Sequence, residues 1–222
     1  MAKKKTRSVV SRRAEHPNKT GAAAGVYPIS TGEAELVPDG YHADGWLLLI
    51  NGVQSSHVIV GQPRMLDFEY MRWIAAVLDL HIQIHLNPEK LRITHLGGGA
   101  CSLARYCADV YPNSRNTVVE LDAKLAEHVR DWFDIPKSPR VKIRVGDAGT
   151  VTRSFAPASR DVVIRDVFAV DKTPVNLRVW ISCGRLITLW GPVDCIFSTA
   201  AMTARLMPPA PKPPPCLRCL NT

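Results

Sequence analysis

The sequence predicts an α/β fold in which a small antiparallel sheet precedes a parallel sheet covered by helices. Short apolar segments of strand length alternate with amphipathic helical segments between residues 65 and 178. Hairpin-type turn signals interrupt the apolar stretch between residues 26 and 64. Apolar strands separated by helices are typical of βαβ units and of a parallel sheet covered on both faces. The rhythm stops after residue 178, so the C-terminal part of the sheet is predicted to be incomplete.

Residues 26–64 form the first predicted domain, a small antiparallel β-sheet. Val-Pro-Asp-Gly at 37–40 is a turn signal. Asn51 and Gly52 form a dipeptide that strongly favours a two-residue β-hairpin. The apolar segments WLLLI and VQSSHVIV lie on either side of this dipeptide and supply two of the strands.

The second predicted domain covers residues 65–178 and begins with a helix over 65–80. Its apolar residues recur at helical spacing, and Asp67 stands where it can cap the start. A helix over 122–134 has one apolar face, and Asp122 is its predicted cap. The other predicted segments are a strand over 91–97, a helix over 102–109, and strands over 116–122, 140–148 and 160–168.

Residues 1–25 are predicted to be a disordered basic arm. The chain has a net charge of +8, and residues 1–20 hold seven Lys or Arg side chains against one Glu. The preferred interpretation is a solvated arm, and contact of this arm with nucleic acid or anionic lipid is the alternative; the folded part is not expected to bind nucleic acid or a membrane. The sequence shows no secretory signal and no apolar stretch of about 20 residues that would span a membrane. A cytoplasmic protein with reduced thiols is expected.

Residues 179–222 are predicted to be an atypical, mostly disordered tail rich in Pro and Cys. Six prolines fall within 208–215. Cys216 and Cys219 form a CxxC pair, but no second pair stands at zinc spacing, so no metal site is predicted. A proline-rich ligand for a groove-binding module is an alternative interpretation. Our preferred hypothesis is a foreign C-terminus, from an out-of-frame or truncated reading, in place of the segments that complete the sheet.

The candidate site lies at the ends of the predicted parallel strands. Gly97, Gly98 and Gly99 follow the first strand, where they allow a tight turn that points N–H groups at a ligand. Glu120 ends the second strand, about 20 residues further on, an offset at which a carboxylate accepts hydrogen bonds from a ribose diol. Asp147 follows the third strand and is placed to accept from the exocyclic amine of a base.

Asp166 follows the fourth strand and completes the set. Ligands of open parallel sheets bind outside the carboxyl ends of the strands, so these residues together predict a nucleoside site. The third glycine of the dinucleotide fingerprint is missing, because Ser102 stands in its place. A single nucleoside such as S-adenosylmethionine is therefore favoured over NAD.

Over about residues 45–178 the chain resembles the spermidine synthase (polyamine aminopropyltransferase) family. That family has a Rossmann-like, class I methyltransferase-type fold behind a small N-terminal β domain. The resemblance lies in the segments LLLINGVQSSH, DFEYMRWIAAVLD, LGGGAC, VVELD, VGDA and DVVIRDVF. It implies that Tyr70 lines the amine pocket and that the nucleoside is bound by Gln54, Gly97, Gly98, Gly99, Glu120, Asp147 and Ala148.

The resemblance implies transfer of an aminopropyl group from decarboxylated S-adenosylmethionine to a polyamine acceptor. The nucleoside is then a co-substrate, with no cofactor tightly bound. An amine of pKa near ~10 must lose a proton before it attacks, so a carboxylate is needed nearby. Asp166 is implied to be that proton acceptor, and Tyr70 to orient the amine. A small-molecule polyamine is the expected partner, and a homodimer is an open alternative to a monomer.

Two residues depart from the motifs of the family. Ala100 replaces an Asp whose carboxylate meets the cationic aminopropyl tail, and Arg72 replaces a Glu near the amine pocket. Ala100 favours an alternative, a methyltransferase-like enzyme that uses ordinary S-adenosylmethionine. Arg72 and the incomplete sheet favour a third, a non-catalytic protein that binds a nucleoside or another protein. The atypical C-terminus also leaves open an impaired enzyme.

Overall fold

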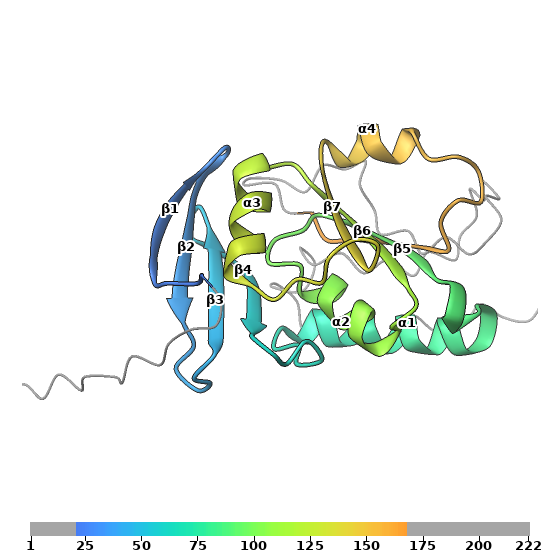
Figure 1. Ribbon diagram of the computed structural model, residues 1–222, viewed down its shortest axis with the longest axis horizontal. Coiled ribbons are helices and arrows are strands. Elements are labelled where there is room, and N and C mark those ends of the chain that lie inside the picture. Colours follow the sequence, from blue (N-terminus) through green and yellow to red (C-terminus); the bar gives the residue numbers. More distant parts are fainter. Residues whose placement is uncertain (1–20, 168–222) are drawn as a thin grey trace, which may run out of the picture.

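The computed structural model describes residues 21–167, which form two four-stranded sheets (Figure 1). The N-terminal sheet is antiparallel, and the second sheet is parallel with helices on both of its faces. The predicted α/β fold is confirmed. The predictions for residues 1–20 and 168–222 lie outside the described residues, and these include the tail and the C-terminal part of the parallel sheet.

The antiparallel sheet is a simple meander in which neighbouring strands follow one another along the chain. The predicted hairpin at Asn51 and Gly52 is present, and both residues have positive φ, at 51° and 78°, as a type I′ turn requires. Before the first strand, the N–H of Gly21 donates to the carbonyl of Asp131 at 3.0 Å, so the end of the predicted arm contacts the folded part. The strands are β1 (Gly25–Ile29), β2 (Gly32–Pro38), β3 (Gly45–Ile50) and β4 (Val53–Ile59).

The parallel sheet has the strand order β7-β6-β5-β8. Its strands are β5 (Arg92–Leu96), β6 (Arg115–Glu120), β7 (Val141–Val145) and β8 (Val162–Arg165). The chain builds outward from β5 through β6 to β7, and then crosses to the other side of β5 to form β8. The order therefore reverses at β5, and ligands of open α/β sheets bind at the carboxyl ends of the strands next to such a reversal. The first residues after β5 and β8 are Gly97 and Asp166.

Four α-helices and one short 3₁₀ helix connect the strands. They are α1 (Glu69–His85), η1 (Pro88–Lys90), α2 (Ser102–Val110), α3 (Ala123–Trp132) and α4 (Ala148–Arg153). The alternation along β6 separates the two faces: Val118 packs with residues of α2 and α3, and Val119 packs with Val151 of α4. The described residues include no helix long and apolar enough to cross a membrane.

The predicted start of the first helix was wrong. The helix begins at Glu69 and not at 65, its N-cap is Phe68, and Asp67 makes no capping bond. The guanidinium of Arg72 donates to the carbonyls of Leu66 and Asp67, at 3.2 and 2.5 Å, and these bonds hold the preceding segment outside the helix. The helix α3 has its predicted cap, because Asp122 accepts from the N–H of Leu125 at 2.8 Å.

The core has three parts, and the largest joins the two sheets. It packs apolar residues of β2, β3 and β4 against α2, α3 and the middle of β6, including Leu36, Leu48, Val58, Leu125 and Val129. The second lies between α1, α2, β5 and β8. There Asp79 of α1 accepts hydrogen bonds from the hydroxyls of Tyr106 and Tyr111, at 2.8 and 2.7 Å. Cys101 and Cys107 are buried thiols, in keeping with core residues.

Candidate active site

The three glycines form a turn that no larger residue fits. Gly97 has φ +89° and its added Cβ would overlap the carbonyl of Asp166. An added Cβ on Gly98 would lie 2.9 Å from a methyl of Val118, and one on Gly99 would lie 2.5 Å from the hydroxyl of Ser56. Real Cβ atoms essentially never come this close to other atoms. The turn is therefore packed on three sides and keeps this geometry only with glycine at all three positions.

Cys101, two residues after the glycines, also has an uncommon backbone. Cys101 has φ 61° and ψ 29°, which is the left-handed region, and it stands immediately before α2. Its N–H donates to the carbonyl of Gly98 at 2.7 Å. A non-glycine residue in this region costs about 1–2 kcal/mol and persists where the surrounding structure enforces it. The strain lies at the start of α2, beside the predicted nucleoside site.

Glu120 holds the glycine turn from the end of the neighbouring strand. Its Oε2 accepts from the N–H groups of Gly98 and Gly99, at 3.0 and 3.3 Å, and its Oε1 accepts from the N–H of Asp122 at 3.0 Å. A carboxylate has about four acceptor positions, so roughly one remains for a further donor. The carboxylate therefore sits against the turn, and it does not extend freely into solvent.

Asp166 and Tyr70 come together although they are 96 positions apart in the sequence. The Tyr70 hydroxyl donates to Oδ2 of Asp166 at 3.1 Å. The other oxygen, Oδ1, is buried and has no hydrogen-bond partner among residues 21–167. The Asp166 N–H donates to the carbonyl of Leu96 at 2.7 Å, so the backbone of β8 is fixed against β5 at this point.

Burial sets the protonation of this pair. Desolvation raises the pKa of Asp166 to about 6, and the hydrogen bond from Tyr70 partly offsets it. Burial and the adjacent Asp166 also raise the pKa of Tyr70, so the phenol keeps its proton and acts as a donor. Asp166 is consequently ionised at neutral pH and is a stronger base than an ordinary aspartate.

A small pocket lies between the glycine turn, β5 and β8. His95, Gly97, Gly98 and Asp166 are among the residues that line it. His95 is buried, and burial lowers its pKa to about 4, so its imidazole is neutral. Nε2 of His95 lies 3.0 Å from Oδ1 of Asn116, which can only accept, so this nitrogen carries the proton. Nothing in the sequence marks His95 as a site residue, because a histidine within an apolar strand has no distinctive pattern.

The other residues predicted to bind the nucleoside lie around the glycine turn, and they contact it less directly than Glu120 does. Asp147 is exposed and caps α4, with Oδ1 accepting from the N–H and the hydroxyl of Thr150, both at 2.7 Å. These bonds lower its pKa. Ala148 begins α4 and packs with the cluster that contains Leu96. Gln54 is exposed on β4, one residue before Ser55, whose hydroxyl would lie 3.0 Å from a Cβ on Gly99.

Strand β4 also contributes Ser56 and His57 to the site, and neither residue was predicted from the sequence. The Ser56 hydroxyl accepts from the N–H of Ala100 at 3.0 Å, and the Ser102 hydroxyl donates to the carbonyl of His57 at 2.9 Å. These four residues join the antiparallel sheet to the turn and to the start of α2. Small polar residues in a strand carry no distinctive pattern, so a link between segments 44 positions apart could be found only from the fold.

The two departures from the family motifs occupy different environments. Ala100 is fully buried, and its N–H is taken by Ser56, so position 100 presents no charge to the site. Arg72 is exposed on α1, and its guanidinium donates to the carbonyls of Leu66 and Asp67. Its positive charge thus serves the segment before α1, in contrast to the negative charge that the family motif has there.

Comparisons with known proteins support the fold and the family resemblance. No family model matches the chain. A solved structure of a probable spermidine synthase from Corynebacterium glutamicum is 63% identical with a TM-score of 0.67, over 69% of this chain and 55% of that one. A polyamine aminopropyltransferase of Vibrio vulnificus is 27% identical over 118 residues, which are 52% of this chain and 38% of that protein.

A second class of relatives consists of methyltransferases. The eEF1A lysine and N-terminal methyltransferase of mouse is 35% identical over 89 residues, which are 39% of this chain and 12% of that protein. The chain thus spans a small part of the curated relatives and little more than half of the solved structure. The resemblance to spermidine synthases and the methyltransferase-type fold are confirmed, and a transferase is the class of protein that both sets of relatives share.

Proposed function

We propose that the chain is an aminopropyltransferase of the spermidine synthase type. The observation that carries the proposal is the buried Asp166, with Oδ2 bound by Tyr70 and Oδ1 unpartnered among residues 21–167, at the edge of the glycine turn. An unpartnered buried carboxylate oxygen is costly and is typical of a site that holds a cationic or hydrogen-bonding ligand. The similarity to the C. glutamicum protein supports the same assignment.

In the proposed reaction the amine nitrogen attacks the aminopropyl carbon that is bonded to sulfur. The new C–N bond forms as the C–S bond breaks, the electron pair of that bond goes to sulfur, and methylthioadenosine leaves. The sulfonium becomes a neutral thioether, so the leaving group needs no acid. The proton lost by the amine passes to Asp166, whose Oδ1 is the oxygen available to receive it.

The protonation of the pair suits this step. Asp166, with its pKa raised to about 6 by burial, is ionised at pH 7 yet more basic than a solvent-exposed aspartate. Tyr70 remains protonated, which fixes one carboxylate oxygen and leaves the other for the amine. The negative charge also favours a cationic substrate in a pocket of low dielectric.

The nucleoside is proposed to lie along the glycine turn. Glu120 would keep its backbone bonds to Gly98 and Gly99 and use its remaining acceptor position for a ribose hydroxyl. Asp147 and Ala148 stand at the end of the next strand, where the base would lie, and Gln54 would approach from β4. Gly97 would let the backbone come close to the ligand.

The test is a product assay for methylthioadenosine with decarboxylated S-adenosylmethionine and a panel of diamines and polyamines. We expect turnover to fall by about 10²–10⁴-fold in Asp166→Asn, because the variant loses a general base. Asp131→Asn, at an exposed position on α3, is the matched control and should keep full activity. Turnover that Asp166→Asn leaves unchanged would overturn the mechanism.

The buried Ala100 supports a second candidate, a methyltransferase that uses ordinary S-adenosylmethionine. With no carboxylate at position 100, the site lacks the group that would select the cationic tail of the decarboxylated form. Calorimetry with both nucleosides separates the two. Tighter binding of decarboxylated S-adenosylmethionine supports the aminopropyltransferase, and tighter binding of the ordinary form supports the methyltransferase. Binding with no turnover on any acceptor would favour the non-catalytic alternative.

A further inference from the structure

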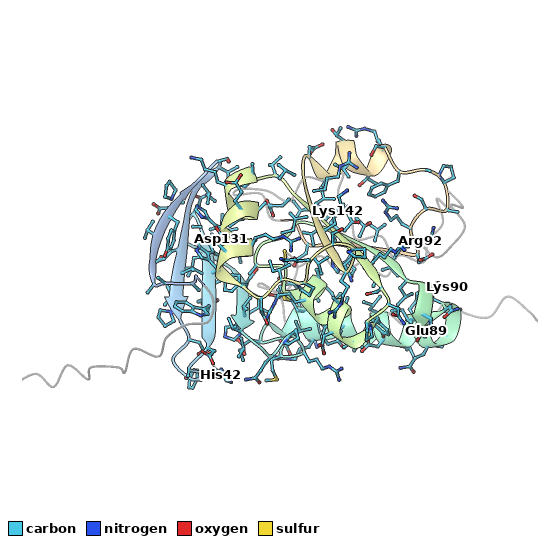
Figure 2. The ribbon with its side chains drawn as sticks, viewed as in Figure 1. His42, Glu89, Lys90, Arg92, Asp131 and Lys142 are labelled. Atoms are coloured by element: carbon cyan, nitrogen blue, oxygen red, sulfur yellow. The ribbon has the colours of Figure 1, made fainter. Side chains whose placement is uncertain are left out.

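A cluster of three metal-ligating side chains lies outside the nucleoside site, at one end of the antiparallel sheet. Nδ1 of His42 lies 2.5 Å from Oδ2 of Asp39, and Nε2 of His57 lies 3.1 Å from the same oxygen. The three atoms all lie within 4.8 Å of one another. Figure 2 shows His42 in the loop at the lower end of the sheet, between β2 and β3. Two imidazoles and a carboxylate are a donor set that zinc sites use, with a water as the fourth ligand.

The loop is built to hold these groups in place. Oδ1 of Asp39 accepts from the N–H of Tyr41 at 2.8 Å, so its second oxygen is turned toward the histidines. The N–H of Asp39 donates to the carbonyl of Gly45 at 2.8 Å, and the N–H of Gly45 donates to the carbonyl of His42 at 3.1 Å. A Cβ on Gly45 would lie 2.6 Å from the Cβ of Asp39, so the loop closes this tightly only with glycine there.

The third ligand comes from a rigid element. His57 is buried on β4, where it pairs with Leu47 of β3, and its carbonyl accepts from the Ser102 hydroxyl at 2.9 Å. The carboxylate of Asp39 is nearly buried and the His42 ring is about half-exposed. Burial disfavours ionisation of Asp39, but hydrogen bonds from Tyr41, His42 and His57 outweigh it and lower its pKa to about 2. The loop thus holds Asp39 with one carboxylate oxygen facing both rings.

The two histidines of the cluster border a cavity. A cavity of about 420 Å³ is lined by His42 and His57 together with residues of α1 and α2. Bonds of about 2.0–2.2 Å to a tetrahedral ion place the ligand atoms about 3.4 Å apart. His42 and Asp39 would thus separate by about 1 Å, which lies within reach of an exposed loop side chain. When the ion binds, the protons on the ring nitrogens that face Asp39 would move to the other nitrogen of each ring or be released to solvent.

We propose that Asp39, His42 and His57 form a binding site for a borderline transition-metal ion, with Zn²⁺ as the best match. Imidazole nitrogen favours this class over Mg²⁺ and Ca²⁺, which take oxygen ligands. The bound ion would tie the loop between β2 and β3 to β4, next to Ser56, which holds the glycine turn. The site does not depend on the proposed transfer reaction, and its test is binding.

The experiment titrates Zn²⁺ by calorimetry into the full chain after removal of metal with a chelator. The background carries C216S and C219S, because cysteine thiolates are zinc ligands and would compete for the added metal. We expect one equivalent to bind, and His42→Ala to weaken binding by about 100-fold or more, beyond the loss of an outer-shell partner. His85→Ala is the matched control: this ring lies beside that of His81 on α1, outside the proposed site, and its removal should leave the affinity unchanged.

A second readout identifies the ligands directly. Co²⁺ in place of zinc should give the visible absorption of a site with nitrogen and oxygen ligands, and Asp39→Asn and His42→Ala should abolish it. Circular dichroism establishes that each variant is folded. Zinc binding that is unchanged in His42→Ala, or lost in His85→Ala, would overturn the assignment, as would the lack of one-equivalent binding in the parent. In those cases the three side chains form a hydrogen-bonded cluster only.

Discussion

The two sheets contribute to the site in different ways. The carboxyl edge of the parallel sheet supplies the glycine turn, Glu120 and Asp166, each one located at the end of a strand. The antiparallel sheet supplies Ser56 from the middle of β4, whose hydroxyl is bound to the N–H of Ala100. The first set follows from chain order and topology, and the second depends on how the two sheets pack. The proposed proton acceptor and the glycine turn thus lie at the edge of the parallel sheet, and the turn is held in place from both sheets.

The largest effect is expected from a side chain added to the glycine turn, where the two sheets meet. Gly97→Ala should lower the free energy of unfolding by about 3 kcal/mol or more, because φ is +89° and the new methyl would overlap the carbonyl of Asp166. Gly61→Ala is the matched control, since its φ is +77° but nothing lies within 4 Å of an added Cβ. The control should lose only about 1–2 kcal/mol. Urea denaturation measures both, and equal losses would show that packing against β8 does not matter.

The next largest expected effect is a pH dependence of the free energy of unfolding, caused by Asp166 at the edge of the parallel sheet. The pKa of Asp166 is raised from 3.8 to about 6 in the folded protein. The folded state therefore binds more protons than the unfolded state between these values, and stability from this group falls as pH rises through that window. Asp166→Asn removes the effect, so the variant should gain about 2–3 kcal/mol over the parent between pH 4 and pH 7.

The unfolding free energies of the parent and of Asp166→Asn are measured at pH 4 and pH 7. The change in their difference isolates Asp166, since the other carboxylates are common to both proteins. Asp131→Asn is the control for the loss of an exposed carboxylate. A difference between Asp166→Asn and the parent that stays constant with pH would mean that Asp166 is not desolvated, and it would contradict the proposed role of Asp166 as a base. Below pH 6 the parent should also lose turnover, because protonated Asp166 cannot accept a proton.

The smallest expected effect concerns a cap that links the two sheets. Asp122 accepts from the N–H of Leu125 in α3, and also from the N–H and hydroxyl of Thr31 between β1 and β2, at 2.6 and 2.8 Å. Burial disfavours its charge, yet these bonds lower its pKa to about 2. Asp122→Ala should cost about 2 kcal/mol. Asp67→Ala should change stability by less than about 0.5 kcal/mol, because Asp67 caps nothing. Thermal unfolding of the pair tests the difference, and a similar loss in both would contradict it.

These two aspartates also show what the sequence can predict. Asp122 was identified correctly because a cap is a local feature, decided by the first turn of the helix. The cap predicted at Asp67 was wrong, because Arg72 binds the carbonyls of Leu66 and Asp67 and the helix starts at Glu69. The hairpin at Asn51 and the succession of strands and helices along the chain were likewise predictable, since both follow from short-range patterns.

The parts of the site that sequence reasoning missed depend on contacts between distant segments. Ser56 and Ala100 are separated by 44 positions, and Asp39 and His57 by 18. Neither pair has a pattern that distinguishes it from ordinary strand and turn residues. The meeting of Tyr70 with Asp166 was implied by the family resemblance, but the unpartnered oxygen and the raised pKa follow only from burial in the folded chain.

The bond between Ser56 and Ala100 has a consequence for slow motions of the molecule. A backbone amide proton that is buried and hydrogen-bonded exchanges with solvent deuterium only when its bond opens. The Ala100 amide is held by a side chain of the other sheet, so its exchange rate measures how often the two sheets separate. The amides of Gly98 and Gly99, held by Glu120 within the parallel sheet, should exchange independently of that event. The exchange rates of these three consecutive amides therefore report on two different motions. Ala100 reports on separation of the two sheets, and Gly98 and Gly99 report on opening of the bonds to Glu120.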